Sequence, residues 1–265
     1  MLRNLKDLEG YALRATDGDI GAVKDFYFDD ERWTVRYLVV KTGHWLGRKV
    51  LISPVSTGAP DDADKVLPVS ITREQVKNSP DIDTDKPVSR QHEIDTLGYY
   101  GYPAYWDGVG LWGAASMPGL MLPEVGYTGA GTAALSADLA DNPALAEAIA
   151  TRHQNDDPHL RSCNDVTGYH IKAQDGEIGH VQGWIVDEES WAIRYLIVDT
   201  SNWWMGHRVL VAPQWITQVS WSDSIVAVNL TREAIESSPP WDGASPPSRE
   251  QEAGIYAHYD RTGYW

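Results

Sequence analysis

An arginine stands in the middle of a strongly apolar stretch at two places in the chain, Arg36 and Arg194. A guanidinium among apolar neighbours needs a carboxylate or a backbone carbonyl as its partner, because an unpaired buried charge is costly. Asp29 and Asp187, each seven residues earlier, are the expected partners. Because the same pair occurs twice, the pattern favours a structural ion pair in a shared framework over a ligand site.

Two further groups of residues resemble metal sites only in part. The acids of residues 81–85 alternate as in a calcium-binding loop, but Lys86 stands where that loop needs glycine and His92 where it needs a bidentate glutamate. The histidines show no paired spacing typical of zinc, and His153 and His159 lie in a polar segment. We therefore interpret residues 81–85 as a solvated turn and expect neither a metal nor a cofactor.

Candidate catalytic residues have simpler structural interpretations. Asp17 and Asp175 each precede a glycine and an apolar strand, which is typical of a carboxylate that caps a turn. The single cysteine, Cys163, aligns with Leu5 in an internal repeat, which favours a packing role over a nucleophile. The sequence contains no nucleophile elbow and no phosphate-binding glycine loop. We expect a protein that is not an enzyme.

Two tryptophan-containing loops are the best candidates for contacts with a partner. Residues 43–49 contain Trp45, and the corresponding residues 201–208 contain Trp203 and Trp204. The two loops differ in length and charge, and differences between matching loops are where separate partners are recognised. Simple packing of these indoles is the alternative interpretation.

A duplication organises the whole chain. Residues 17–42 return as residues 175–200 at an offset of 158, and one added residue in the second tryptophan loop makes the later offset 159. Repeats of this size are domains rather than solenoid units. The repeat predicts a first domain at residues 2–106, a second at residues 160–265, and a linker at residues 107–159.

Each copy has a pattern of strands and turns. Asp17-Gly18 predicts a hairpin, residues 33–40 form the strongest strand, and shorter strands follow at residues 50–52 and 66–69. Both faces of residues 33–40 are apolar enough to be at least half buried, as in a small closed barrel. The predicted fold class is mainly β, with two small β-barrels of five or six strands, each carrying short helices and a Tyr/Trp-rich tail.

Helix signals are short and lie near the end of each copy. Thr72–Gln75 and Ser248–Gln251 have the spacing of capping boxes, whereas Ser89 begins a segment without the full box. The linker between the copies is rich in glycine and alanine, and a short helix is expected after Pro143.

Net charge and composition exclude several classes of partner. The formal charge of -16 and pI near 4.8 argue against nucleic acid and against an anionic membrane surface, since both need basic residues. The first ten residues lack the pattern of a secretory signal, and the longest stretch without charge, residues 109–123, is too short to span a bilayer. We expect a cytoplasmic protein that does not insert into membranes.

Taken together, these motifs resemble the PRC-barrel domains, which are named from the cytoplasmic part of the photosynthetic reaction-centre H subunit and also occur in a ribosome-maturation factor. The resemblance rests on DGDIGAV and DGEIGHV, WTVRYLVV and WAIRYLIV, VLISP, LTREAI, SREQE and the closing GYW, and covers both copies. It implies a small β-barrel used for protein contacts, with no catalytic residues to carry over. The chain is most similar to tandem bacterial members linked to stress responses.

The expected function is therefore a soluble tandem PRC-barrel scaffold that mediates protein contacts and forms a homodimer through its aromatic tails and linker. Two alternatives remain open. One is an accessory protein of a photosynthetic or electron-transfer membrane complex, although the chain lacks the membrane helix of the H subunit and the second domain of the ribosome factor. The other is a protein that binds an apolar small molecule between the barrels.

Overall fold

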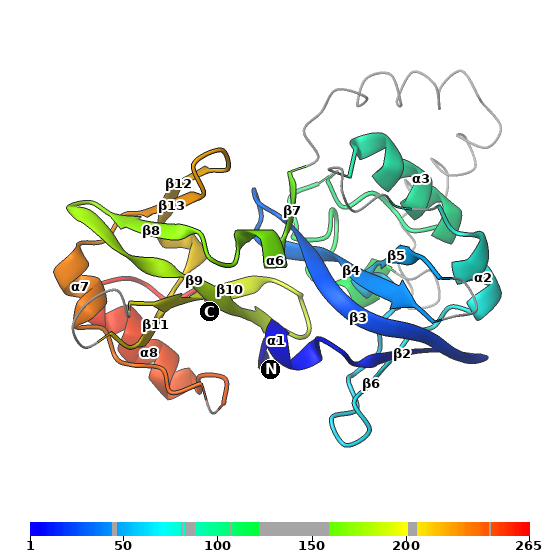
Figure 1. Cartoon of the computed structure of the whole chain (residues 1–265), viewed down its shortest axis with the longest axis horizontal. Coiled ribbons are helices and arrows are strands. Elements are labelled where there is room, and N and C mark those ends of the chain that lie inside the picture. Colours follow the sequence, from blue (N-terminus) through cyan, green and yellow to red (C-terminus); the bar gives the residue numbers. More distant parts are fainter. Residues whose placement is uncertain are drawn as a thin grey trace. The chain divides into compact units, whose positions relative to one another are not determined.

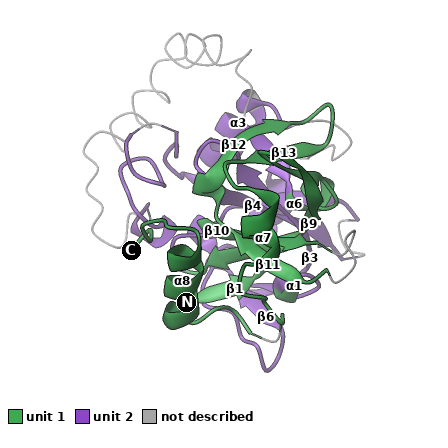
Figure 2. Cartoon of the chain, turned by 90° about the vertical axis from the view of Figure 1, so that its left-hand side faces the viewer, with its two compact units in different colours: residues 1–7, 163–188, 192–265 green, residues 8–162, 189–191 purple. Residues whose placement is uncertain are grey.

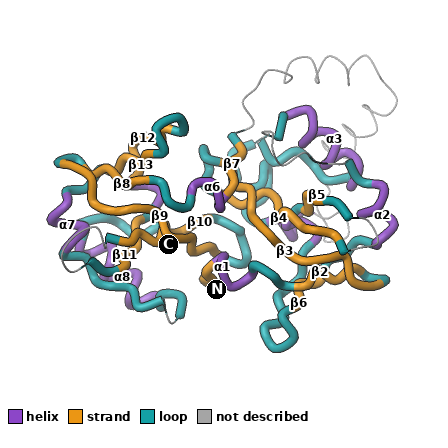
Figure 3. The backbone as a smooth tube through the Cα atoms, viewed as in Figure 1, coloured by secondary structure: helices purple, strands orange, loops and turns teal. Residues whose placement is uncertain are grey.

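A computed structural model of the chain describes residues 1–43, 47–80, 82, 88–106, 108–121, 159–200, 206–243 and 245–265. These residues form two compact units, coloured separately in Figure 2. Unit 1 comprises residues 1–7, 163–188 and 192–265, and unit 2 comprises residues 8–162 and 189–191. Among the described residues, more lie in strands than in helices in each unit, and the helices are short (Figure 3), so the predicted mainly β class is confirmed.

Unit 2 is built on a six-stranded sheet (Figure 1). Its strands are β2 (Ala12–Ala15), β3 (Gly18–Asp29), β4 (Thr34–Thr42), β5 (Lys49–Ile52), β6 (Val66–Pro68) and β7 (Leu160–Ser162). The order is β5-β4-β3-β2-β6, with β7 also paired to β3. Only the β2–β6 pair among these is parallel. The hairpin predicted at Asp17-Gly18 joins β2 to β3.

Unit 1 has a seven-stranded sheet with the same core order. Its strands are β1 (Leu2–Asn4), β8 (His170–Ala173), β9 (Gly176–Asp187), β10 (Ile193–Asp199), β11 (Arg208–Val211), β12 (Ile216–Ser220) and β13 (Ile225–Val228). The order is β11-β10-β9-β8-β13-β12, with β1 also paired to β9. Unit 1 has one strand more than the five or six predicted, and the additional strand is β12. The matching positions of the first copy contain Gly58 and Pro60, and a proline cannot donate the backbone hydrogen bond that a strand pair needs.

Three of the described helices begin where the capping signals predict. They are α1 (Leu5–Leu8), α2 (Arg73–Asn78), α3 (Arg90–Tyr100), α6 (Cys163–Val166), α7 (Arg232–Glu236) and α8 (Arg249–His258), with 3-10 turns at Pro54–Ser56, Pro118–Met121 and Pro213–Trp215. Complete capping boxes open α2, from Thr72 to Gln75, and α8, from Ser248 to Gln251. Ser89 caps α3 by accepting a hydrogen bond from the His92 amide.

Strand β4 confirms the expected burial on both faces but starts later than predicted. Thr34 to Val40 are all buried, including the guanidinium of Arg36. Trp33 was predicted as the first strand residue, but it lies in the preceding turn with a φ of 50°, and its ring stacks on Phe28. Trp191 occupies the matching turn with a φ of 58°.

The first strand of each repeat copy belongs to the unit built mainly from the other copy. Strand β1 pairs with β9 in unit 1, from Leu2 opposite Asp187 to Asn4 opposite Ile185. Strand β7 pairs with β3 in unit 2, antiparallel as well. This reciprocal strand exchange makes the units differ from the predicted boundaries, because β3 and β9 extend past their hairpin partners and offer an edge there.

Part of the predicted linker is ordered against unit 2. Trp112 and Met121 are buried, and short backbone bridges join Gly110 to Gly113 and Trp112 to Ala115. Residues 107 and 122–158, with the helix expected after Pro143, lie outside the described residues. In the part of the chain that the structure describes, no helix has the length and apolar character needed to cross a membrane.

Candidate functional site

Arg36 lies at the centre of a polar network in unit 2. Its side chain is 0% exposed, and Nη2 donates to Oδ2 of Asp29 over 2.9 Å. Nη1 donates to the carbonyl oxygen of Leu111 over 2.6 Å. The guanidinium lies beside two rings that meet edge to face, 4.0 Å from the centroid of Tyr105 and 4.8 Å from that of Trp112. The structure thus brings together the two residues predicted as an ion pair.

A second arginine and a glutamate complete this network. Nη1 of Arg90 donates to Oε2 of Glu93 over 2.9 Å, and the Tyr105 hydroxyl donates to Oε1. Burial raises the pKa of Glu93 to about 7, against the lowering effect of Arg90 and of the tyrosine hydrogen bond. We call Asp29, Arg36, Arg90, Glu93, Tyr105 and Trp112 the Arg36 network.

Residues 108–115 cover the Arg36 network, and we call them the cap. Arg32 holds the start of the cap, because its guanidinium donates to the carbonyl oxygens of Tyr105, Gly108 and Gly110. The indole Nε1 of Trp112 donates to the carbonyl oxygen of Ser190 over 2.7 Å, within unit 2. The cap therefore gives Arg36 both a carbonyl acceptor and an aromatic face while it excludes water.

Unit 1 repeats the network with the residues of the second copy. Nη2 of Arg194 donates to Oδ2 of Asp187 over 3.2 Å, and the guanidinium lies 4.1 Å from the centroid of Tyr264. Arg249 pairs with Glu252 over 3.0 Å. Glu252 also accepts hydrogen bonds from the hydroxyls of Tyr195, over 2.9 Å, and Tyr264, over 2.7 Å. We call Asp187, Arg194, Tyr195, Arg249, Glu252, Tyr264 and Trp265 the Arg194 network.

The two networks differ in their contact with solvent. The side chain of Arg194 is 22% exposed, and that of Arg249 is 57% exposed, compared with 9% for Arg90. Trp265, whose ring lies 4.5 Å from the Arg249 guanidinium, is 54% exposed. Matched residues thus form a sealed network in unit 2 and a network open to solvent in unit 1.

Carboxylates and arginines in both networks are engaged with one another, which suits a framework or a recognition surface. Arginine and tyrosine side chains contact the buried glutamates, so both carboxylate oxygens of Glu93 and of Glu252 have a partner. Across the described ranges, no cluster of three or more His, Cys, Asp and Glu side chains is placed to hold a metal ion. The Arg194 network places a cation beside flat aromatic rings. Such a combination can bind carbonyl oxygens and other aromatic groups.

The other candidate carboxylates have structural partners. Oδ1 of Asp17 accepts a hydrogen bond from the Arg73 amide over 2.7 Å, and Oδ1 of Asp175 accepts one from the Arg232 amide over 2.8 Å. Each aspartate therefore joins its hairpin turn to the first turn of α2 or α7, a longer-range role than the turn cap expected. Cys163 is buried, as is Leu5 at the matching position.

Several predicted sites fall on residues that the structure does not describe. The candidate contact residues Trp45, Trp203 and Trp204 lie outside the described residues, as do His153 and most of the acidic turn at 81–85. His159 is described, and its Nδ1 lies 2.9 Å from Oδ1 of Asp30 in unit 2.

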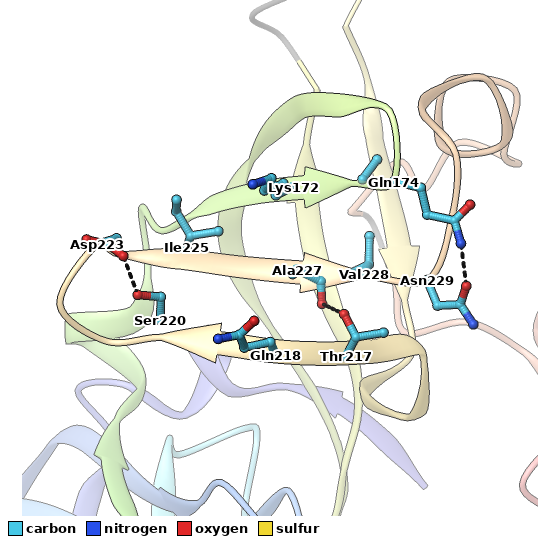
Figure 4. A pocket seen from close by; sticks show the side chains of 11 residues that line it. Lys172, Gln174, Thr217, Gln218, Ser220, Asp223, Ile225, Ala227, Val228 and Asn229 are labelled. Carbon is cyan, nitrogen blue, oxygen red and sulfur yellow. Dashed lines mark hydrogen bonds between the residues drawn. The ribbon is translucent and has the colours of Figure 1, made fainter.

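A groove of about 400 Å³ lies over β8, β13 and β12 in unit 1 (Figure 4). Its lining is rich in amides and hydroxyls. Gln174 donates to Asn229 over 2.6 Å, and Ser220 donates to Asp223 over 2.7 Å. These polar groups of the lining therefore bond to each other.

The residues that the sequence interpretation did not single out are Arg90, Glu93, Tyr105 and Trp112. The repeat held a signal for three of them, since Arg90, Glu93 and Tyr105 recur as Arg249, Glu252 and Tyr264 at the offset of 159. The role of Trp112 had no such signal, because it depends on a tertiary contact in the predicted linker.

Comparison with known proteins supports the resemblance over part of the chain. Residues 2–76 match the family of the PRC-barrel domain. An uncharacterized protein of Deinococcus radiodurans is 32% identical over 83 residues, which are 31% of this chain and 30% of that relative. The chain therefore spans less than a third of the length of this relative.

Two matched tyrosines provide a test of the networks. The Tyr37 hydroxyl is buried and has no hydrogen-bond partner among the described residues, whereas that of Tyr195 donates to Glu252. We expect Tyr37→Phe to leave the free energy of unfolding unchanged or to increase it, and Tyr195→Phe to decrease it by about 1–2 kcal/mol. Urea unfolding followed by circular dichroism measures both. An equal loss of unfolding free energy in the two variants would contradict the hydrogen bonds assigned to these tyrosines.

The raised pKa of Glu93 predicts a pH dependence. Its folded-state pKa of about 7 exceeds the ordinary 4.5, so the folded state binds the proton more tightly than the unfolded state. This contribution to stability is complete below pH 4.5 and is lost as the pH rises to about 7. Glu93→Gln is expected to flatten the change in melting temperature across that window, and Glu74→Gln, at an exposed position, to retain it. An unchanged slope in Glu93→Gln would refute the prediction.

Proposed function

We propose that this chain is a non-enzymatic scaffold protein made of two PRC-barrel-type domains that bind other proteins. The observation that carries the proposal is that the ionisable groups at the centre of each unit are paired with one another in the same pattern. Such a duplicated framework supports surfaces and loops without a reacting centre. The family match over residues 2–76 and the sequence repeat support the same assignment.

The proposal includes the finer points of the expected architecture. Each sheet is taken as the core of a closed PRC-type barrel, and residues 122–158 continue the glycine- and alanine-rich linker. The charge of -16 supports protein partners over nucleic acid and over an anionic membrane surface. A cytoplasmic location without membrane insertion is part of the proposal. A role in stress responses rests on the resemblance to tandem bacterial members of the family.

Self-association into a homodimer is part of the proposal. Tyr105 and Trp112, from the first aromatic tail and the linker, are buried within unit 2. Among the described residues of this unit, the large apolar side chains that remain exposed are Tyr99, Val109 and Leu120. Two of these three lie in the predicted linker segment, which supports a role for that segment in contacts between copies.

Light scattering is the measurement for self-association. The chain of 29.5 kDa is expected to give twice that mass at high micromolar concentration. The double variant Val109→Ser, Leu120→Ser is expected to shift the population toward monomer, because the contact loses apolar area, while its circular dichroism spectrum stays unchanged. A monomer of the unmodified chain at that concentration would refute the homodimer.

Partner binding is tested by affinity capture from the organism that encodes the chain. We expect at least one protein to be recovered in stoichiometric amounts, and to be lost in either the Trp45→Ala variant or the Trp203→Ala, Trp204→Ala variant. Glu74→Gln is the control at an exposed position. Recovery of the same proteins by every variant would exclude the tryptophan loops as contact sites, and recovery of none would refute the scaffold.

A further inference from the structure

The groove over β8, β13 and β12 of unit 1 has an apolar floor between polar walls (Figure 4). Ile225 and Ala227 of β13 form the floor, with Lys172 of β8 on one side and Gln218 of β12 on the other. Asp223, in the turn between β12 and β13, lies at one end. We call these five residues the β13 groove. The volume of about 400 Å³ is in the range of ligand-binding clefts.

A β-bulge builds the wall on β12. The strand register shifts between Ile216 and Gln218, so Thr217 is an extra residue opposite Ala227. Both Thr217 and Gln218 line the groove, because a bulge interrupts the alternation of side chains between the two faces. The Thr217 hydroxyl donates to the carbonyl oxygen of Ala227 over 3.3 Å. The side-chain amide of Gln218 makes no hydrogen bond with a described residue, so it keeps a donor and an acceptor for a ligand.

The charged residues of the groove have no ion pair of their own. Lys172 makes no ion pair with any residue that the structure describes, although its counterpart in the first copy, Arg14, lies 3.1 Å from Oδ1 of Asp19. Asp223 accepts a hydrogen bond from the Ser220 hydroxyl over 2.7 Å, and no cation of the described residues pairs with it. Both Lys172 and Asp223 are exposed. The β13 groove thus carries one cation and one anion that are available to a ligand.

This combination of residues is specific to the second copy. At the matching positions the first copy has Ala59 instead of Gln218 and Pro68 instead of Ala227. The ring of Pro68 lies close to Gly58, because a Cβ on that glycine would be 3.1 Å from the proline Cγ. The duplicated framework therefore carries an amide wall and a small floor residue in unit 1 alone, which is what a separate binding role for the second copy requires.

The groove residues are spaced like the side chains of an extended chain. Lys172 is level with Ala227 in the strand register. Ile225 comes two residues before Ala227, and Asp223 comes two residues before Ile225. Side chains on one face of an extended segment also recur every second residue, about 6.6 Å apart. A segment that runs along β13 would therefore place three successive side chains of one face near Lys172, Ile225 and Asp223.

We propose that the β13 groove binds an extended segment of a partner protein with the pattern acidic-x-apolar-x-basic, in either chain direction. The acidic side chain meets Lys172, the apolar side chain packs on Ile225 and Ala227, and the basic side chain meets Asp223. The Gln218 amide bonds to the peptide groups of the segment. This inference rests on the proposed function, because it gives the chemistry of one partner segment that such a scaffold would hold.

The test uses the full chain and the fluorescein-labelled peptide Glu-Ser-Val-Ser-Lys-Ser-Val-Ser-Glu, which presents the pattern in both directions. Fluorescence anisotropy is expected to show saturable binding that weakens as salt is added, because exposed charges are screened. Lys172→Gln and Asp223→Asn are each expected to weaken binding about threefold to fivefold, since each removes one exposed ion pair. Arg14→Gln, the matched change in the first copy, is expected to leave binding unchanged.

Charge reversal separates recognition from an effect on folding. The double variant Lys172→Glu, Asp223→Lys is expected to lose the first peptide and to bind Lys-Ser-Val-Ser-Glu-Ser-Val-Ser-Lys, because both contacts are restored with opposite signs. Both positions are exposed, so its circular dichroism spectrum is expected to stay unchanged. If the double variant keeps that spectrum but does not bind the reversed peptide, the charge pattern is overturned.

Other outcomes also decide between the alternatives. No binding of the first peptide to the unmodified chain would overturn the proposed site, while a partner recovered by affinity capture would leave the scaffold function standing. Unchanged binding by Lys172→Gln and Asp223→Asn, or an equal loss in Arg14→Gln, would place the peptide elsewhere and overturn the proposal. If light scattering without peptide gave a dimer that the double variant converts to monomer, the groove would belong to a second copy of the chain. That result would overturn the assignment to a partner protein.

Discussion

A guanidinium enclosed between apolar strands is the constraint on which the organisation of unit 2 depends. Arg36 lies in the middle of β4 with no exposed area, so its charge has to be met from within the fold. Asp29 meets it from the neighbouring strand β3, Leu111 supplies a carbonyl from the cap, and Tyr105 brings a ring from the segment after α3. One charged side chain thus links the sheet to the helix, the aromatic tail and the cap.

The duplicated chain places the same chemistry in two environments. Asp187, Arg194 and Tyr264 repeat the contacts of the first copy within unit 1, but they retain access to water. In a more polar environment an ion pair contributes less to stability and its members can exchange partners more readily. Because the chain is duplicated, the Arg36 network can stabilise the fold of unit 2 while the matching Arg194 network stays in contact with solvent in unit 1.

Local signals in the sequence predicted the parts of the structure that depend on neighbouring residues. The Asp17-Gly18 hairpin and the capping boxes before α2 and α8 follow from short-range chemistry, and the spacing of Arg36 and Asp29 follows from an antiparallel pair joined by a short turn. The position of Trp33 in a turn was missed because its aromatic, β-forming character suggested a strand. The cap and the exchanged strands depend on contacts between residues more than 70 positions apart, which no local pattern encodes.

The reciprocal strand exchange has a consequence for how the protein folds and evolves. Because β1 comes from the first copy and completes the sheet of unit 1, while β7 comes from the start of the second copy and completes that of unit 2, each sheet needs a strand from both copies. Loss of β1 would therefore damage the sheet built mainly from the second copy, and loss of β7 would damage the sheet built mainly from the first. Selection would then act on the two repeat copies together, and the loss of either copy after the duplication would be disfavoured.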